Sequence, residues 1–178
     1  MLDLIGFAAL ALVALIGGIL AVAAGRPDTF QTARTARIAA SPERLYALIN
    51  DLRQMNSWNP YALREASGTT TYSGPASGKG AAFAFAGPKS GAGSIEIVDC
   101  VAPRSVVIRL LMVKPFKADN TVNFTLQPEG PATAVTWAMS GRQPLLAKVM
   151  MLFINCDKMV GRDFEEGLAN LKAIAEQA

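Results

Sequence analysis

Residues 118–140 read ADNTVNFTLQPEGPATAVTWAMS, and this stretch decides the fold. Apolar side chains recur at every second position at Val122, Phe124 and Leu126, and again at Val135, Trp137 and Met139. The Pro- and Gly-containing segment PEGP at residues 128–131 separates the two runs. Alternation with a period of two predicts strands with one apolar face, and a short turn between two such strands predicts an antiparallel hairpin.

The same period extends through most of the chain on the N-terminal side of this hairpin. The alternating segments are joined by short links rich in Gly and Pro, which favours an antiparallel meander over a parallel sheet. The expected strands are Thr29–Ala39, Gly68–Tyr72, Ala81–Ala86, Gly93–Val101, Ser105–Lys114, Ala118–Gln127 and Thr133–Ser140.

Helical signals bracket this set of strands. Ser41 is a suitable N-cap and Pro42 suits the first position of a helix, so a helix is expected to begin there. A shorter helix or turn is expected over residues 53–61, and one long amphipathic helix from Pro144 to about Glu176. The long helix can cover the apolar face of a curved sheet, and a cavity is expected where sheet and helix diverge.

The N-terminal segment has a different character. The run Leu4–Ala24 contains no charged residue, and at about 1.5 Å per residue it is long enough to cross about 30 Å of hydrocarbon. We therefore expect one N-terminal transmembrane helix. The alternative is a cleaved signal peptide, because Ala21-Val22-Ala23 resembles a cleavage site, and the protein would then be secreted or periplasmic.

The positions of basic residues predict the orientation of this segment. Arg26, Arg34 and Arg37 follow the apolar run and no basic residue precedes it. By the positive-inside rule the protein is expected in the inner (cytoplasmic) membrane as a single-pass protein, with its remaining residues on the cytoplasmic side. The expected division is an anchor at residues 1–25, a linker at residues 26–29 and one domain at residues 30–178.

Several kinds of chemistry are excluded by composition. The chain has no histidine and two cysteines that lie far apart in sequence, which excludes Ser-His-Asp catalysis and the usual zinc sites. The Gly-rich segment at residues 74–80 lacks the spacing of a phosphate-binding loop. A net charge of +3 without a dense basic cluster does not indicate nucleic-acid binding. We therefore predict no cofactor and no metal.

Asp157 is the candidate catalytic residue. It lies on the apolar stripe of the expected last helix, four residues after Phe153 and three before Val160. A carboxylate that faces an apolar cavity can act as a general acid or base. The alternative is that Asp157 pairs with a basic residue such as Arg109 or Arg162, or lies in water at the edge of the stripe.

The remaining candidate site residues are apolar or aromatic and are expected to line a ligand cavity. Each of them also suits plain core packing. They are Trp58, Tyr61, Phe83, Phe85, Ile108, Leu110, Phe124, Trp137, Met139, Met150 and Phe153.

From about residue 30 to residue 176 the chain resembles the START-like, Bet v 1-like helix-grip (SRPBCC) superfamily, in particular its bacterial polyketide cyclase/dehydrase and lipid-transport group. The resemblance implies an α+β helix-grip fold, in which about seven antiparallel strands wrap around a long C-terminal helix. It implies no shared active-site residues. The segments that carry it are residues 39–51 (AASPERLYALIND), Trp58 with Pro60, residues 133–141 (TAVTWAMSG) and residues 158–172 (KMVGRDFEEGLANLK).

These observations together predict a membrane-anchored binding or transport protein for a hydrophobic small molecule such as a lipid, isoprenoid or polyketide-like compound. The resemblance places Trp58 over the cavity entrance. One alternative is a cyclase or dehydratase without metal or histidine that uses Asp157 or Tyr61. A second alternative is an interaction module without a pocket. No oligomeric state is predicted.

Overall fold

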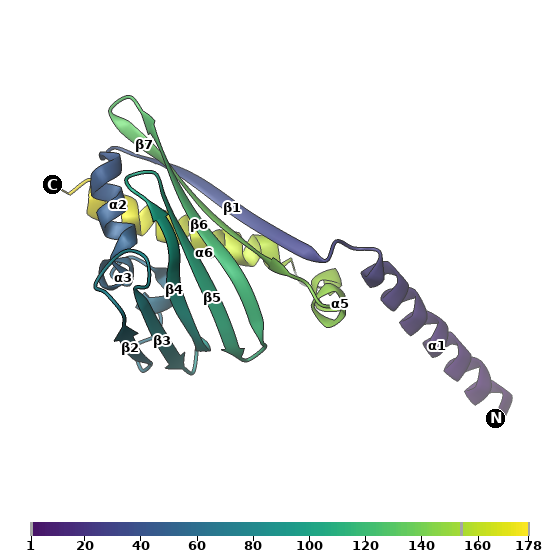
Figure 1. Cartoon of the computed structure of the whole chain (residues 1–178). Helices are drawn as coiled ribbons and strands as arrows, with labels where there is room; N and C mark the ends of the chain where they lie inside the picture. Colours follow the sequence, from purple (N-terminus) through teal and green to yellow (C-terminus); the bar gives the residue numbers. More distant parts are fainter. Residues whose placement is uncertain (1, 154, 178) are drawn as a thin grey trace.

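The computed structural model describes residues 2–153 and 155–177. Its centre is a seven-stranded antiparallel sheet in the order β1-β7-β6-β5-β4-β3-β2 (Figure 1). The predicted α+β architecture, a seven-stranded antiparallel sheet with a C-terminal helix, is confirmed. The strands are β1 (Thr29–Ile38), β2 (Thr69–Ser73), β3 (Ala82–Gly87), β4 (Gly91–Val101), β5 (Ser105–Lys114), β6 (Ala118–Glu129) and β7 (Ala132–Arg142).

The hairpin predicted at residues 118–140 is formed by β6 and β7. Phe124 lies opposite Trp137 and Val122 lies opposite Met139, so the apolar positions of the two strands share one face. Gly130 in the turn has a φ of +66°, a conformation that side chains with a Cβ rarely adopt. The hairpin therefore begins the inner face of the sheet.

The first strand joins the last one. β1 pairs with β7 along its whole length, from Thr29 opposite Arg142 to Ile38 opposite Thr133. The hydroxyls of Thr35 and Thr136 lie 2.8 Å apart on the outer side of this pair. Residues about 100 positions apart in sequence thus become neighbours at one edge of the sheet.

Short helices follow β1. The Ser41 hydroxyl accepts a hydrogen bond from the Arg44 N–H at 3.3 Å, as expected for the cap of α2 (Pro42–Asn50). The Asp51 carboxylate caps α3 (Leu52–Met55) in the same way. Asn59 caps α4 (Pro60–Leu63) through the Tyr61 N–H. Each of these caps begins one of the three short helices that connect β1 to β2.

The C-terminal segment differs from the prediction of one long helix. It forms α5 (Leu145–Phe153) and α6 (Cys156–Ala175). Asn155 separates the two: it is the N-cap of α6, and its side-chain oxygen accepts the Lys158 N–H at 2.9 Å. An Asn side chain that takes a backbone N–H starts a new helix and ends the preceding one. α6 then crosses the inner face of the sheet, whereas α5 lies beyond its end (Figure 1).

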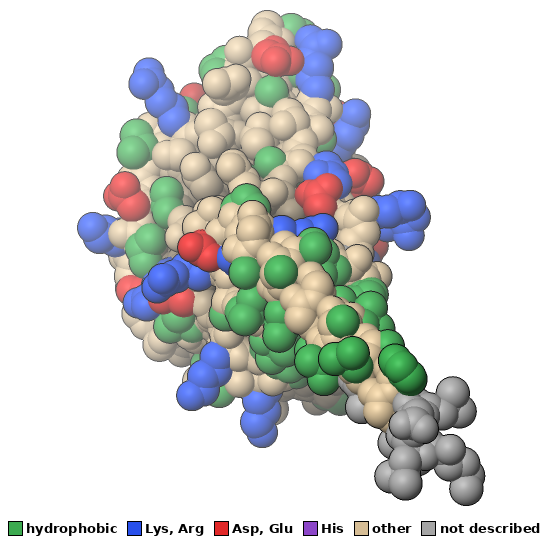
Figure 2. Space-filling model, turned by 90° about the vertical axis from the view of Figure 1, so that its right-hand side faces the viewer, with side chains coloured by type: hydrophobic (Ala, Val, Ile, Leu, Met, Phe, Trp, Pro, Cys, Tyr) green, Lys and Arg blue, Asp and Glu red, His purple; other side chains and the backbone are tan. Residues whose placement is uncertain are grey.

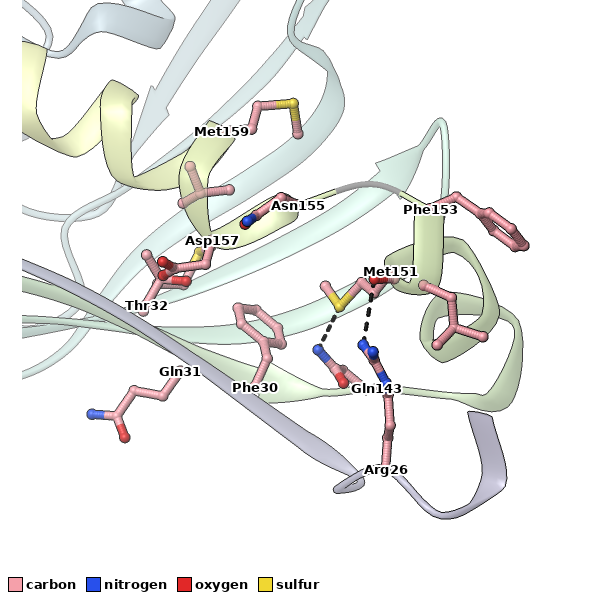
Figure 3. Close-up of a pocket in the computed structure, with 13 residues that line it drawn as sticks. Arg26, Phe30, Gln31, Thr32, Gln143, Met151, Phe153, Asn155, Asp157 and Met159 are labelled. Atoms are coloured by element: carbon pink, nitrogen blue, oxygen red, sulfur yellow. Dashed lines mark hydrogen bonds between the residues drawn. The ribbon is translucent and has the colours of Figure 1, made fainter. Parts of the chain in front are cut away.

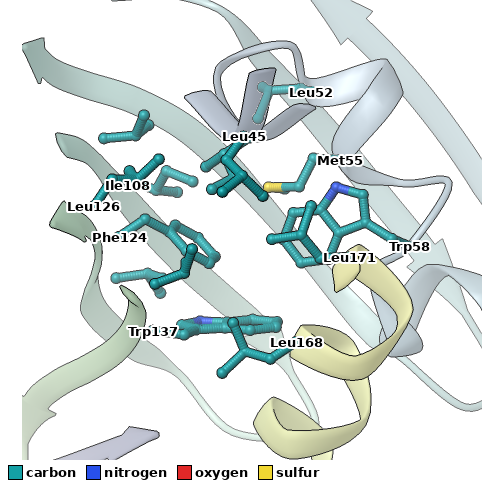
Figure 4. Packing of buried hydrophobic residues seen from close by; sticks show 14 of the residues in the cluster. Leu45, Leu52, Met55, Trp58, Ile108, Phe124, Leu126, Trp137, Leu168 and Leu171 are labelled. Carbon is teal, nitrogen blue, oxygen red and sulfur yellow. The ribbon is translucent and has the colours of Figure 1, made fainter. Parts of the chain in front are cut away.

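The core lies between the sheet, α6 and the short helices (Figure 4). Trp137 stacks on Phe164 of α6 with ring centres 4.3 Å apart, and it also contacts Trp58 edge-on at 5.7 Å and Phe124 at 5.0 Å. Phe124 lies 5.9 Å from Trp58 in a second edge-on arrangement. These four rings fix the distance between α6 and the sheet.

The N-terminal segment forms α1 (Leu2–Ala24), which extends away from the sheet (Figure 1). However, no helix in the described part of the chain combines the length and apolar character needed to cross a membrane. The prediction that residues 4–24 form a transmembrane helix, and with it single-pass anchoring in the inner membrane, is therefore wrong. The division of the chain at residues 26–29 stays a prediction.

The end of the molecule from which α1 emerges is rich in apolar side chains. Figure 2 shows hydrophobic side chains gathered along α1 and at its base, with charged side chains around them. On α5 the Leu146 side chain is exposed, and Phe153 at its end is 73% exposed. The apolar residues of α5 thus do not belong to the core that α6 closes.

The close packing of α6 gives a testable prediction. A Cβ at Gly167 would lie 2.5 Å from the Trp137 ring and 2.9 Å from Pro60, both held rigidly. We expect Gly167→Ala to lower the free energy of unfolding by about 1–3 kcal/mol, as overpacked core substitutions do, although Ala is the better helix former. Urea denaturation measures this change.

Gly161→Ala is the matched control in the same helix. The three atoms that a Cβ at Gly161 would approach most closely all belong to the guanidinium of Arg34, a flexible and partly exposed group that can move away. This variant should stay within about 1 kcal/mol of the wild type, because the gain in helix propensity offsets the displaced ion pair. Equal stability of the two variants would contradict the packing assigned to Gly167.

Candidate functional site

A pocket of about 630 Å³ lies at the end of the sheet, between β1, β7 and the junction of α5 with α6 (Figure 3). Its lining is mixed, with apolar side chains on the sheet and both helices and polar side chains towards the opening. The residues are Arg26, Phe30, Gln31, Thr32, Met139, Gln143, Met151, Leu152, Phe153, Asn155, Asp157, Met159 and Val160.

The floor of the pocket is built by the pairing of β1 with β7. Thr32 lies opposite Met139 and Phe30 lies opposite Gly141, so these positions share the inner face. A Cβ at Gly141 would lie 2.9 Å from the Phe30 ring and 2.0 Å from the side-chain oxygen of Asn120. The missing side chain at Gly141 therefore leaves room for Phe30 to lie flat at the pocket floor.

One wall of the pocket is α5, and a buried lysine attaches it to the start of β1. The Lys148 side chain is 6% exposed, and its Nζ donates to the Arg26 carbonyl at 2.7 Å and to Asp28 Oδ1 at 2.5 Å. The Gln143 N–H also donates to the Asp28 carbonyl, at 2.7 Å. The hydrogen bond from Lys148, and then its charge, lower the pKa of Asp28.

Two donors converge on Met151 at the pocket opening (Figure 3). Arg26 Nη1 donates to the Met151 carbonyl at 3.3 Å, and Gln143 Nε2 donates to the Met151 Sδ at 2.7 Å. A thioether sulfur is a weak hydrogen-bond acceptor. Two donors therefore hold Met151, one through a long hydrogen bond to its carbonyl and the other through its weakly accepting sulfur.

The opposite wall is the first turn of α6, which carries Asp157. Its carboxylate lies 3.4 Å from Arg34 Nη2, and its side chain is 60% exposed. Arg34 Nε also donates to Glu165 at 2.8 Å, and the hydrogen bonds to Glu165 and Asp157 raise the pKa of Arg34. Arg109, one of the two expected partners of Asp157, instead binds Asp119 through two hydrogen bonds.

The eleven apolar and aromatic candidates differ in location and in burial. Met139 and Phe153 line the pocket together with Asp157. Five others fill the core and are at most 5% exposed: Trp58, Phe83, Ile108, Phe124 and Trp137. Phe85 and Leu110 are half-buried against that core, and Tyr61 and Met150 are 39% and 37% exposed. Ligand contact by any of these residues stays a prediction.

The SWNPY turn at residues 57–61 belongs to the core rather than to the pocket lining. Trp58 is fully buried, and its indole N–H donates to the Leu48 carbonyl at 3.0 Å. Asn170 of α6 donates to the Trp58 carbonyl at 3.1 Å, which ties the turn to the helix. Burial, and then the charge of Asp163, raise the pKa of the Tyr61 hydroxyl, so it is protonated at neutral pH.

Several pocket residues were not among the sequence candidates. Phe30 and Thr32 alternate along the first expected strand, so knowing its pairing with the last strand would have placed both beside Met139. Arg26 and Gln143 lie outside the strands, and nothing in the local pattern indicates them. Met151 was expected within one continuous helix, and the break at Asn155 directs it to the pocket instead.

Comparison with known proteins supports the fold described above. The family model described as polyketide cyclase/dehydrase and lipid transport matches residues 29–176. No curated protein sequence matches the chain.

Solved structures share this architecture at low sequence identity. A protein from Chromobacterium violaceum superposes with a TM-score of 0.59 and 17% identity, covering 86% of this chain and 100% of that one. Major latex-like protein 151 from Panax ginseng superposes with a TM-score of 0.62 and 11% identity, covering 84% of this chain and 99% of that one. The di-domain ARO/CYC protein BexL of the BE-7585A biosynthetic pathway superposes with a TM-score of 0.62 and 15% identity, covering 87% of this chain and 52% of that one. At these identities the likeness shows the fold alone.

The ion pair of Lys148 with Asp28 gives a prediction for pH. The folded-state pKa of Asp28 lies below its unfolded value of about 3.9. The pair therefore stabilises the folded protein above that unfolded value, and its contribution disappears as the pH falls through the folded-state pKa. Carboxyl NMR titration should show a lowered midpoint for Asp28, and Lys148→Met should raise that midpoint.

Amide hydrogen exchange tests whether the ion pair of Lys148 with Asp28 holds α5 in place. At neutral pH, Asp28→Asn should speed amide exchange in α5, because the Lys148 ammonium then loses a charged partner. Asp119→Asn, which removes an exposed carboxylate bound to Arg109, is the control and should leave α5 unchanged. An unaltered α5 in Asp28→Asn would show that this pair does not hold the helix.

Proposed function

We propose, because the chain belongs to the polyketide cyclase/dehydrase and lipid-transport family, that it binds a hydrophobic small molecule in the pocket between β1, β7, α5 and α6. The observation that carries the proposal is the pocket itself, about 630 Å³ in volume and located where α6 begins and the sheet continues beyond it. Pockets of about 300–1,000 Å³ bury most of the surface of a small organic ligand.

The apolar lining supports this proposal. Phe30 and Met139 line the floor, Val160 lies on the α6 side, and Met151 and Leu152 form the wall on α5. Unbranched thioether side chains adapt to irregular ligand shapes at low cost. Each Å² of apolar ligand surface that such a lining buries contributes about 25 cal/mol. A ligand with an extended or branched hydrocarbon part fits this lining better than a sugar or nucleotide does.

Under this proposal the ligand enters past α5. This helix packs against α1 and is held by hydrogen bonds of Lys148 and Met151, and its apolar residues are not inserted into the core. The exposed side of α5 carries Leu146 and Phe153, which keep contact with solvent. Movement of one short helix therefore opens the pocket without disturbing the rings that hold α6 on the sheet.

Binding without catalysis is favoured over the two alternatives. Asp157 is the one carboxylate among the described lining residues, and it is paired with Arg34 and open to water. This placement suits a structural ion pair better than an acid or base in a dry site. The pocketless interaction module is disfavoured by the pocket itself.

Filling the pocket tests the proposal. Met139→Trp places a larger side chain on the floor, and we expect it to weaken binding of N-phenyl-1-naphthylamine, a neutral apolar fluorophore, by about tenfold or more. Met150→Trp is the control, because Met150 lies on α5 outside the pocket lining. The affinity of this variant for the fluorophore should stay within about twofold of the wild-type value. Fluorescence titration of the full chain measures both.

Two results would contradict the proposal: equal affinity in both variants, or no binding to the wild type. Thermal unfolding of Met139→Trp shows whether the variant stays folded. Mass spectrometry of an organic extract, from full-length protein purified without detergent, then identifies the compound class that occupies the native pocket.

A further inference from the structure

The polar groups at the pocket opening carry information about the ligand beyond its hydrophobic part. Arg26 and Gln143 come from segments far apart in the sequence, and both direct donors at Met151 (Figure 3). Gln143 donates to a thioether, which is a weak acceptor, and Arg26 donates to a neutral backbone carbonyl through a long hydrogen bond of 3.3 Å. An anionic acceptor makes shorter and stronger hydrogen bonds with such donors, so it can replace both.

The surrounding charges leave Arg26 free to bind an anion. Asp157, which lines the same pocket, is paired with Arg34 at 3.4 Å. Asp28, two residues after Arg26, is paired with Lys148 at 2.5 Å. Within residues 2–153 and 155–177, Arg26 makes no ion pair, and its recorded side-chain partner is the Met151 carbonyl. One cation without a carboxylate partner therefore stands beside an apolar cavity.

On the basis of the proposed function, we propose that the ligand is an amphiphile with a carboxylate head group, bound by the guanidinium of Arg26 and the amide of Gln143. The hydrocarbon part lies against Phe30 and Met139. Met151 accepts hydrogen bonds from these two donors in the structure, and the carboxylate replaces it on binding.

The number and type of donors favour a carboxylate over other head groups. A guanidinium presents parallel N–H groups that match the two oxygens of a carboxylate, and the Gln143 amide adds a neutral donor. The single unpaired positive charge of Arg26 balances a monoanion. A phosphate monoester, with a charge near −2, would leave part of its charge uncompensated beside Asp157.

Decanoate and decan-1-ol test the proposal, because they share a chain and differ in the head group. At a pH of about 7.5 the carboxylate is ionised. Isothermal titration of the full chain should show decanoate binding about tenfold more tightly than decan-1-ol, as expected for charge-assisted hydrogen bonds. Arg26→Gln should remove this preference and leave the affinity for decan-1-ol within about twofold of the wild type. Gln143→Leu should reduce the preference by about threefold.

Arg104→Gln is the control for the loss of one positive charge. Arg104 lies in the turn between β4 and β5, outside the pocket lining, and its exposed side chain makes the variant comparable with Arg26→Gln. It should keep the full preference for decanoate. An equal loss in Arg104→Gln would show that overall charge, rather than the Arg26 site, selects the anion.

The methyl resonance of Met151 provides a readout that affinity alone does not. Decanoate should shift it as the carboxylate replaces Met151 on Arg26 and Gln143, and the shift should be absent in Arg26→Gln. Equal wild-type affinities for decanoate and decan-1-ol would overturn the head-group proposal and leave hydrophobic binding intact. Failure of both compounds to bind would instead overturn the proposed function, and the head-group proposal with it.

Discussion

The antiparallel pairing of β1 with β7 is the constraint on which the rest of the structure depends. It is the longest-range pairing in the sheet, joining residues 29–38 to residues 133–142. Because the register is set over the whole length of both strands, Thr32 must lie beside Met139 and the segment before β1 must lie beside Gln143. The pocket floor and the polar groups at its opening come from this single pairing.

The position of α6 divides the inner face of the sheet into a packed core and a pocket. Where the helix covers the inner face, stacked and edge-on rings around Trp137 pack between helix and sheet. Where the helix begins, at Asn155, the same face continues without cover and the pocket forms. The aromatic side chains therefore stabilise the fold at one end, and thioether and aliphatic side chains leave an adaptable space at the other.

The architecture could be predicted from local patterns, whereas the site could not. Alternation in residues 118–140 and the caps at Ser41 and Pro42 are local signals, and they placed the sheet and the first helix correctly. The N-terminal apolar run was a poor guide, because absence of charge alone indicated a membrane span that the structure does not support. The pocket depends on strand pairing and on the cap at Asn155, where one side chain competes with helix continuation. Most of the aromatic residues that were expected to line a ligand cavity are instead buried in the core, among them Trp58, Phe124 and Trp137.

The attachment of α1 to the pocket has a mechanical consequence. The Gly25 N–H donates to the Ala21 carbonyl and the Arg26 N–H to the Ala23 carbonyl, both at 3.1 Å, so the hydrogen bonding of α1 continues up to the pocket opening. Ala23 is fully buried, which gives the helix a pivot at its base. The backbone of Arg26 is therefore continuous with α1, so the direction of α1 and the position of one of the two donors at the pocket opening are linked through a single turn of the chain.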